Sequence, residues 1–291
     1  MSEIDLEKAI EESKRILNEG DNFLFSEYGP TYFFTTENIR AYLENNSFSK
    51  NRALSVLASG DQVFNLAYFG MKEIDTFDIN ILTYFTFYLK RALILEFPYV
   101  DFRNLSAGSF YLFYLEQFEE LLEMLKSSLP EIVYEYYRKL VEYQKKDYNL
   151  EFRNLFKGFD FQYDKDYNLY ASSESAYYTT KENLKETQIG FTFHDAKYVP
   201  FYIGGNYDII LLSNIADYFG GEYHLTTLEE FLSFINGYYQ LLNENGVLIH
   251  YLYQLKERNI IKNSCITPSD LDQNSVYQID KKEGYYLIRK K

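Results

Sequence analysis

Asp78 lies where a carboxylate can bind a nucleoside. An apolar run over 53–57 predicts a buried parallel strand, and the small and polar residues Ala58-Ser59-Gly60-Asp61 predict a tight turn after it. A second strand is expected over 73–79, which puts Asp78 near its carboxyl end, roughly 20 residues after the turn. A carboxylate there can accept hydrogen bonds from the two hydroxyls of a ribose, and the small residues of the turn let a ligand approach the backbone.

The glycine pattern of this turn argues against a dinucleotide. The fingerprint G-x-G-x-x-G needs three glycines, whereas Gly60 stands alone here. A nucleoside without a pyrophosphate needs less of the loop, so S-adenosylmethionine is the cofactor that we expect. A helix should follow the turn and end at Gly70, because apolar residues recur at helical spacing.

Composition narrows the possible partners. The net charge of -14 argues against nucleic acid and against an anionic membrane surface, since both would repel the chain at long range. The single cysteine, Cys265, excludes an intrachain disulfide framework and suits a reducing compartment. The longest apolar patch, 81–89, is too short to cross a bilayer, which takes about 20 residues. We therefore expect a soluble, cytoplasmic protein without stable membrane insertion.

Helical patterns surround the first two strands. An amphipathic helix is expected over 1–20 and a shorter helix over 36–46. After Asn80, which can cap the next helix, a strongly apolar helix runs to Phe97 and ends at Pro98. Two further helices are expected over 109–129 and 130–146. About a hundred residues of mainly helical insertion thus separate the second strand from the third.

The α/β pattern resumes near residue 188. Strands are expected over 189–193, 207–213 and 247–253, with a helix after Thr226 or Thr227 and a turn at Asn245-Gly246. A hairpin over 275–289 closes the chain. This order predicts a Rossmann-like class I methyltransferase fold of the α/β class, with a mostly parallel sheet, a C-terminal antiparallel hairpin and the helical insertion. The predicted domains are an N-terminal helical cap (1–51), an α/β domain (52–80 and 188–291) and the insertion (81–187).

Several strings resemble the successive motifs of class I S-adenosylmethionine-dependent transferases. They are SVLASGDQ, TFDIN, FTFHDAKYVPF, YDIILLSNIADYF and LNENGVLIHY. More narrowly, ASGDQVFNLAYFG followed by FDINILTYFTFYLKRALI resembles the S-adenosylmethionine:diacylglycerol 3-amino-3-carboxypropyltransferase family of betaine-lipid synthesis. The general resemblance covers residues 52–80 and 188–291. Against the narrower one, this acidic chain offers no basic surface helix to dock on a membrane.

The resemblance implies where the cofactor binds. Asp78 would bind the ribose hydroxyls, with Ile79 or Asn80 beside the adenine. Asp195, with Ala196, would meet the adenine amino group, although His194-Asp195 could equally be a surface turn. The loop against the methionine end of the cofactor would consist of Ser59, Gly60 and Asp61.

The resemblance also implies an acceptor side. Ser213 and Asn214, at the end of the fourth strand, would face the sulfonium and the acceptor. Asp217 and Tyr218 are either acceptor-side groups or the start of the next helix. The sequence does not choose the group that removes the acceptor's proton, for which the candidates are Asp217, His194, Tyr28 and Tyr218.

The predicted function is transfer of a methyl or 3-amino-3-carboxypropyl group from S-adenosylmethionine to a small-molecule or lipid-like acceptor. The alternative is a non-catalytic nucleotide-binding or interaction protein on the same scaffold, because no catalytic base is obvious. A nicotinamide oxidoreductase is disfavoured by the missing glycines. His194, His224 and His250 lack metal-ligand spacing, and we expect no metal. Tyr28 and Tyr32 are either lid residues over the ligand or packed core residues.

Overall fold

The chain divides into two compact units. A computed structural model describes residues 4–19, 26–107, 115–146, 152–157, 167–215, 228–251, 277–282 and 285–290. The first unit, here named the helical unit, comprises Met1–Arg40, Leu57–Tyr68 and Asp78–Glu186. The second, the sheet unit, comprises Ala41–Val56, Phe69–Phe77 and Thr187–Lys291. The three predicted domain boundaries remain a prediction.

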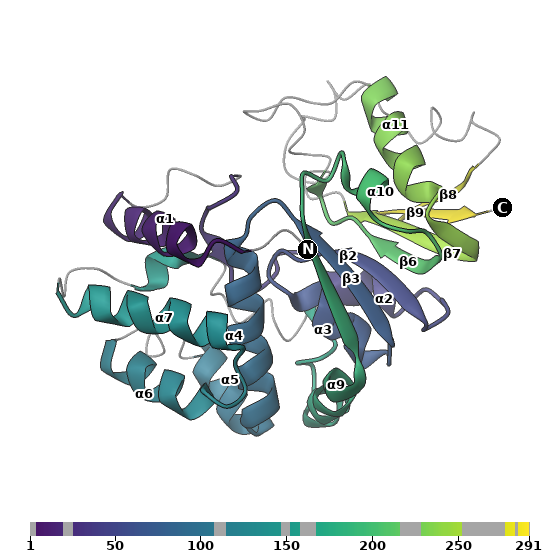
Figure 1. The fold of residues 1–291 in the computed structure, drawn as a ribbon. Helices are drawn as coiled ribbons and strands as arrows, with labels where there is room; N and C mark the ends of the chain where they lie inside the picture. Colours follow the sequence, from purple (N-terminus) through teal and green to yellow (C-terminus); the bar gives the residue numbers. More distant parts are fainter. Residues whose placement is uncertain are drawn as a thin grey trace. The chain divides into compact units, whose positions relative to one another are not determined.

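A seven-stranded sheet forms the sheet unit (Figure 1). Its order is β5-β3-β2-β6-β7-β9-β8; β3, β2, β6 and β7 run parallel, while β9 is antiparallel to β7 and β8 is antiparallel to β9. This order is that of the predicted Rossmann-like class I methyltransferase fold, which is confirmed. The strands are β2 Arg52–Val56, β3 Glu73–Asp78, β5 Gln188–Phe193, β6 Tyr207–Leu211, β7 Leu242–Tyr251, β8 Tyr277–Lys282 and β9 Tyr285–Lys290.

The central strands β2 and β6 are apolar because both faces of the sheet are covered there. Every residue of β6 is buried, as are all residues of β2 except Arg52. Continuous apolar runs are typical of parallel strands that are buried on both sides. The strand order changes direction between β2 and β6, and ligands of open α/β sheets bind beyond the carboxyl ends of the strands at such a point.

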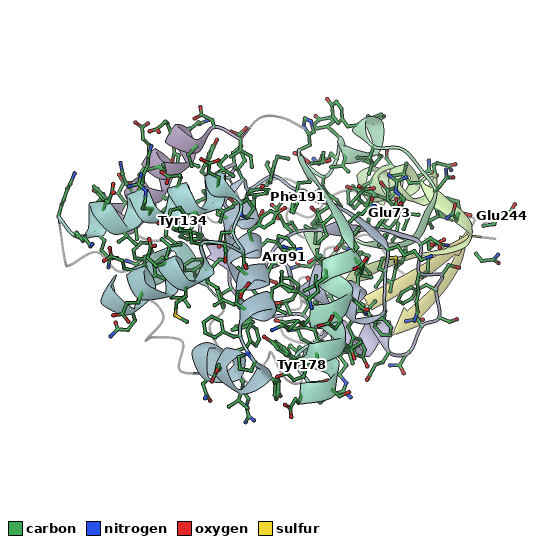
Figure 2. All side chains as sticks on the ribbon, turned by 60° about the horizontal axis from the view of Figure 1, so that its bottom comes forward. Glu73, Arg91, Tyr134, Tyr178, Phe191 and Glu244 are labelled. Atoms are coloured by element: carbon green, nitrogen blue, oxygen red, sulfur yellow. The ribbon has the colours of Figure 1, made fainter. Side chains whose placement is uncertain are left out.

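The predicted turn at Asn245-Gly246 lies inside β7, at an irregularity where four residues of β7 face one residue of β6. The strand begins at Leu242, and its register against β6 shifts between Tyr207 and Ile209. Asn245 has a φ of 63°, and a Cβ on Gly246 would lie 2.9 Å from the carbonyl oxygen of Tyr207. The left-handed residue that a turn needs is therefore present at Asn245, but β7 begins at Leu242, before the predicted start at Val247. Glu244, within this irregularity, is exposed and projects outward (Figure 2).

The helical unit is built around α4 (Leu82–Glu96). Both sides of this helix are buried, and it packs against α7 (Glu131–Gln144), α9 (Glu174–Glu186) and α5 (Tyr99–Ala107). The Asn80 side chain caps α4 as predicted, because its Oδ1 accepts a hydrogen bond from the Leu82 N–H at 3.0 Å. The helix ends at Phe97, which is extended before Pro98.

The remaining elements of the helical unit surround this core. The N-terminal helix α1 (Leu6–Glu19) packs on α7, as does α6 (Leu115–Leu125); both lie beside α7 in Figure 1. The strand β1 (Thr31–Tyr32) pairs with β4 (Phe156–Lys157), which follows the short helix η2 (Phe152–Leu155). Helix α3 (Asp61–Tyr68) packs on α9. Helices α5 and α9 are not predicted from the sequence.

Three further helices lie in the described part of the chain. Helix α2 (Ile39–Leu43) is shorter than the predicted helix over 36–46. In the sheet unit, α10 (Val199–Tyr202) follows β5, and α11 (Leu228–Tyr239) packs on β7. No helix in the described part of the chain is long and apolar enough to cross a membrane.

Candidate functional site

The loop that follows β2 is tightly wound. Ala58 has a φ of 43° and Gly60 a φ of 79°, and the Gly60 N–H donates to the Leu57 carbonyl at 2.6 Å. A Cβ on Gly60 would lie 2.9 Å from a ring carbon of Phe87. The structure therefore gives a second reason for a glycine here, because the space that a side chain would fill is already occupied by α4.

Asp78 ties this loop to the start of α4. Its Oδ2 accepts a hydrogen bond from the Ala58 N–H at 2.8 Å, and its Oδ1 accepts one from the Asn80 N–H at 2.9 Å. Burial raises the pKa of Asp78 to about 6, although the N–H groups of Asn80, Ala58 and Ile79 oppose the rise. A carboxylate has about four acceptor sites, so Asp78 can still accept further hydrogen bonds.

The side chains of the two residues after Asp78 differ in whether a ligand can contact them. Ile79 is 40% exposed and offers an apolar contact. The buried Asn80 uses its whole amide inside the protein: besides capping α4, its Oδ1 accepts from the Gly29 N–H at 3.3 Å and its Nδ2 donates to the Gly29 carbonyl at 2.9 Å. Of the two predicted neighbours of the adenine, only Ile79 therefore has an exposed side chain.

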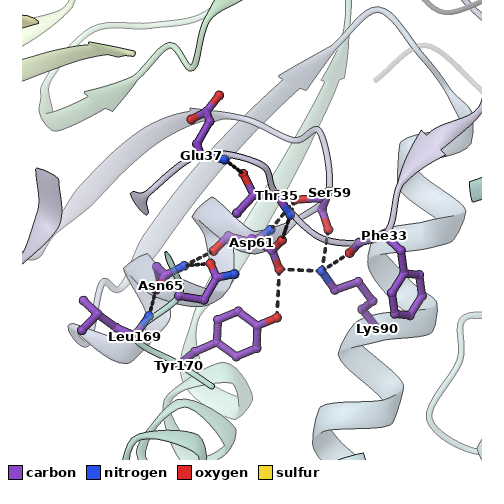
Figure 3. Close-up of polar contacts among 10 residues, drawn as sticks. Phe33, Thr35, Glu37, Ser59, Asp61, Asn65, Lys90, Leu169 and Tyr170 are labelled. Atoms are coloured by element: carbon purple, nitrogen blue, oxygen red, sulfur yellow. Dashed lines mark hydrogen bonds and ion pairs between the residues drawn. The ribbon is translucent and has the colours of Figure 1, made fainter. Parts of the chain in front are cut away.

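Asp61 lies at the centre of a buried polar cluster (Figure 3). Its side chain is fully buried and pairs with Lys90 Nζ at 2.5 Å. The Tyr170 hydroxyl donates to Oδ1 at 2.9 Å, and the Ser59 hydroxyl and the Thr35 N–H donate to Oδ2 at 2.8 and 2.5 Å. Four donors use the acceptor capacity of this carboxylate. The side chain of Asp61 thus fixes the loop from behind.

The side-chain amide of Asn65 extends the cluster along α3. The Nδ2 of Asn65 donates to the Asp61 carbonyl and to Asn168 Oδ1, at 2.7 and 2.6 Å, and its Oδ1 accepts from the Leu169 N–H at 2.6 Å. Lys90, Asn65 and Tyr170 are not among the residues predicted from the sequence. A lysine within a mostly apolar helix was the signal that could have revealed the cluster.

In the sheet unit, Asp195 forms a turn after β5. Its Oδ1 accepts from the Lys197 N–H at 2.9 Å, which is the turn contact weighed as an alternative to ligand binding. The Ala196 carbonyl accepts from the buried Tyr238 hydroxyl at 2.7 Å. His194 stacks on Tyr202 with 4.2 Å between ring centroids. The two ligand-binding roles of Asp195 and Ala196 stay predictions.

Ser213 has a strained backbone at the carboxyl end of β6. Its φ is 54°, and its carbonyl accepts from the His250 ring Nδ1 at 2.8 Å and from the Tyr251 N–H at 3.0 Å. The Ser213 hydroxyl donates to Asn214 Oδ1 at 3.1 Å. Burial lowers the pKa of His250 to about 4, so the ring is neutral and serves to hold Ser213. Strain of this kind clusters at functional sites.

The other candidates for proton transfer are Tyr28, Asp217 and Tyr218. Tyr28 is buried under Lys8, and burial together with Asp5 and Glu27 raises its pKa, which makes it a weaker candidate than its sequence position suggested. Asp217 and Tyr218 lie outside the described residues. Within those residues, no group of three or more His, Cys, Asp or Glu side chains could hold a metal ion.

Comparison with known proteins gives distant likenesses only. No family model matches the sequence, and no curated protein matches it. The rRNA methyltransferase aviRa from Streptomyces viridochromogenes aligns over 99% of this chain and 85% of its own, with 9% identity and a TM-score of 0.38. TehB from Haemophilus influenzae aligns over 89% and 63%, with 10% identity and a TM-score of 0.36.

A Streptococcus mutans protein in complex with SAH aligns over 89% of this chain and 100% of its own, with 9% identity and a TM-score of 0.39. All of these TM-scores are below 0.5, so the likenesses carry no argument about activity. The fold assignment rests on the strand order.

Proposed function

We propose that this protein is an S-adenosylmethionine-dependent transferase that moves a methyl or 3-amino-3-carboxypropyl group to a small-molecule or lipid-like acceptor. One observation carries the proposal: the carboxylate of Asp78, at the end of β3, holds the loop after β2 through the Ala58 N–H and keeps acceptor capacity. In an open α/β sheet, a carboxylate in this position is suited to the hydroxyls of a ribose.

The residues of the helical unit have distinct parts in this proposal. Asp78 accepts hydrogen bonds from the ribose hydroxyls, and the exposed Ile79 packs beside the adenine. The loop residues Ser59 and Gly60 offer backbone to the methionine end, while Asp61 holds the loop in place. Asn80 orients the segment at Gly29 and the start of α4.

The residues of the sheet unit are proposed for the adenine amino group and for the acceptor. Asp195 and Ala196 take the former role, and Ser213 and Asn214 the latter; Asp217 and Tyr218 remain predicted acceptor-side residues. S-adenosylmethionine supplies a carbon activated by the sulfonium, so the protein's share is to align the nucleophile and to accept its proton where needed. The alternative is a non-catalytic nucleotide-binding protein. It would keep the contacts proposed for the cofactor and would need no contacts to an acceptor.

Calorimetric titration with S-adenosylmethionine tests the proposal. We expect saturable binding to the wild-type protein and a loss of about tenfold or more in affinity for Asp78→Asn, because the amide cannot accept from two N–H groups and from ribose hydroxyls together. Glu73→Gln, which changes an exposed carboxylate at the other end of β3, is the matched control and should bind normally. A folded wild-type protein that does not bind would refute the proposal.

Product analysis then separates the reactions. With an acceptor present, methyl transfer leaves S-adenosylhomocysteine, and aminocarboxypropyl transfer leaves methylthioadenosine. Binding without either product across an acceptor panel would favour the non-catalytic alternative.

A further inference from the structure

Lys90 is the most unusual residue of α4. Its neighbours in the helix are mostly apolar, yet its side chain is fully buried. Burying an ammonium group is costly unless it is paired and hydrogen-bonded. Nζ meets three acceptors, one for each N–H: the Phe33 carbonyl at 2.5 Å, the Ser59 carbonyl at 3.0 Å and Asp61 Oδ1 at 2.5 Å.

These acceptors come from two segments of the helical unit, one after β1 and one that runs from the loop after β2 into α3. Phe33 follows β1, Ser59 lies in the loop after β2, and Asp61 begins α3. Asp61 in turn accepts from the Ser59 hydroxyl, so Ser59 is held by its carbonyl and by its side chain at once (Figure 3). A single side chain from α4 therefore fixes the orientation of the Ser59–Gly60 peptide group.

Most backbone N–H and C=O groups of the loop already have hydrogen-bond partners within the protein. The Ala58 N–H binds Asp78, the Gly60 N–H binds the Leu57 carbonyl, and the Gly60 carbonyl accepts from the Phe64 N–H. The Asp61 N–H donates to the Ser59 hydroxyl. Only the peptide group between Ala58 and Ser59 has no partner among the described residues, although Ser59 is just 3% exposed. Ala58, which supplies the carbonyl of this peptide group, is only half-buried. A backbone N–H and C=O without a protein partner in such a place are suited to a ligand.

A role in stability alone does not explain the buried ion pair between Lys90 and Asp61. Stability alone does not require buried charges, since well-packed apolar residues often replace a buried ion pair without loss. Apolar residues, however, cannot donate to the Ser59 carbonyl. We propose that Lys90 is a positioning residue for the cofactor loop, which presents the Ala58–Ser59 peptide group to the bound ligand. This inference rests on the proposed function.

Two variants separate positioning from stability. Lys90→Met removes the donor to Ser59 but leaves Asp61 buried without its cation, so it should lower both the unfolding temperature and the affinity for S-adenosylmethionine. Lys90→Met combined with Asp61→Asn removes both charges. It should recover part of the stability, yet its dissociation constant should stay about tenfold above that of the wild type, because the loop is no longer preorganised.

Arg91→Met is the matched control. Arg91 is the next residue of α4, is half-buried and donates to the Leu184 carbonyl at 3.3 Å, which does not belong to the loop. Its removal should leave the affinity unchanged. All titrations are made well below the lowest unfolding temperature.

The outcomes are distinguishable. A wild-type protein that does not bind S-adenosylmethionine refutes the proposed function. Wild-type binding together with normal affinity in the folded double variant refutes the positioning role alone. If the double variant does not fold, Tyr170→Phe decides, since it deletes one hydrogen bond to Asp61 without changing a charge. A several-fold loss of affinity in that variant supports the role of the cluster, and an unchanged affinity overturns it.

Discussion

Replacing Gly60 by alanine should destabilise the protein for two reasons that the structure lets us estimate. A residue with a Cβ at a φ of 79° costs about 1–2 kcal/mol in the left-handed region. The new methyl carbon would also lie 2.9 Å from Phe87 and 3.3 Å from Phe64. Both rings are fully buried and stack at 5.3 Å, so they cannot move aside freely. Overpacking of this kind costs about 1–3 kcal/mol.

One effect opposes these costs. Alanine restricts the unfolded chain more than glycine, which returns about 0.4–1 kcal/mol. The net expectation for Gly60→Ala is a loss of about 1–5 kcal/mol in the free energy of unfolding, measured by urea denaturation with the same m-value as the wild type. The affinity for S-adenosylmethionine should fall as well, because the loop must shift to relieve the contact.

Gly204→Ala is the matched control. No heavy atom lies within 4 Å of its added Cβ, and Gly204 does not have a positive φ. This change should therefore alter stability by less than about 0.5 kcal/mol. A Gly60→Ala protein as stable as the wild type, or a comparable loss in Gly204→Ala, would contradict the packing described for the loop.

Two predictions concern pH. The free energy of unfolding should fall by about 2 kcal/mol between pH 7.5 and pH 5 through His250 alone, because its pKa of about 4 in the folded state lies below the unfolded value, so the unfolded state binds the proton first. His250→Phe should remove that part of the pH dependence in denaturant titrations, and an identical slope in both proteins would contradict the burial of a neutral ring. The affinity for S-adenosylmethionine should weaken as pH falls through about 6, by about tenfold at pH 5, because protonated Asp78 loses acceptor capacity. Asp78→Asn should show no such step in calorimetry, and a wild-type affinity that does not change over this range would exclude Asp78 as the ribose anchor.

The strands could be predicted because each carries its signal locally. The apolar run of β2 and that of β6 identify buried strands without knowledge of the rest of the chain. The C-terminal hairpin follows from alternation around a charged turn. Asp78 could be placed at the end of β3 for the same reason, since a strand end and a turn 20 residues earlier are both visible in the sequence.

The cluster around Lys90 could not be predicted in this way. Lys90 and Asp61 are 29 positions apart, and Tyr170 is 109 positions from Asp61. Helical periodicity tells which residues share a face, but it does not tell which distant groups meet that face. Lys90 has no acidic residue three or four positions away in α4, so its partner had to lie elsewhere in the chain. The helix sequence therefore predicts that Lys90 has a distant partner, but it does not identify Asp61.

Asp61 and Asp78 show why two aspartates near the same loop have different parts. Asp61 accepts from four donors, including a buried ammonium group, which uses the capacity of a carboxylate. Asp78 accepts only backbone N–H groups among the described residues, and burial without a cation raises its pKa. A desolvated carboxylate with unused acceptor sites gains most from new hydrogen-bond donors. Asp61 therefore holds the loop, and Asp78 is the residue that we propose for the ribose hydroxyls.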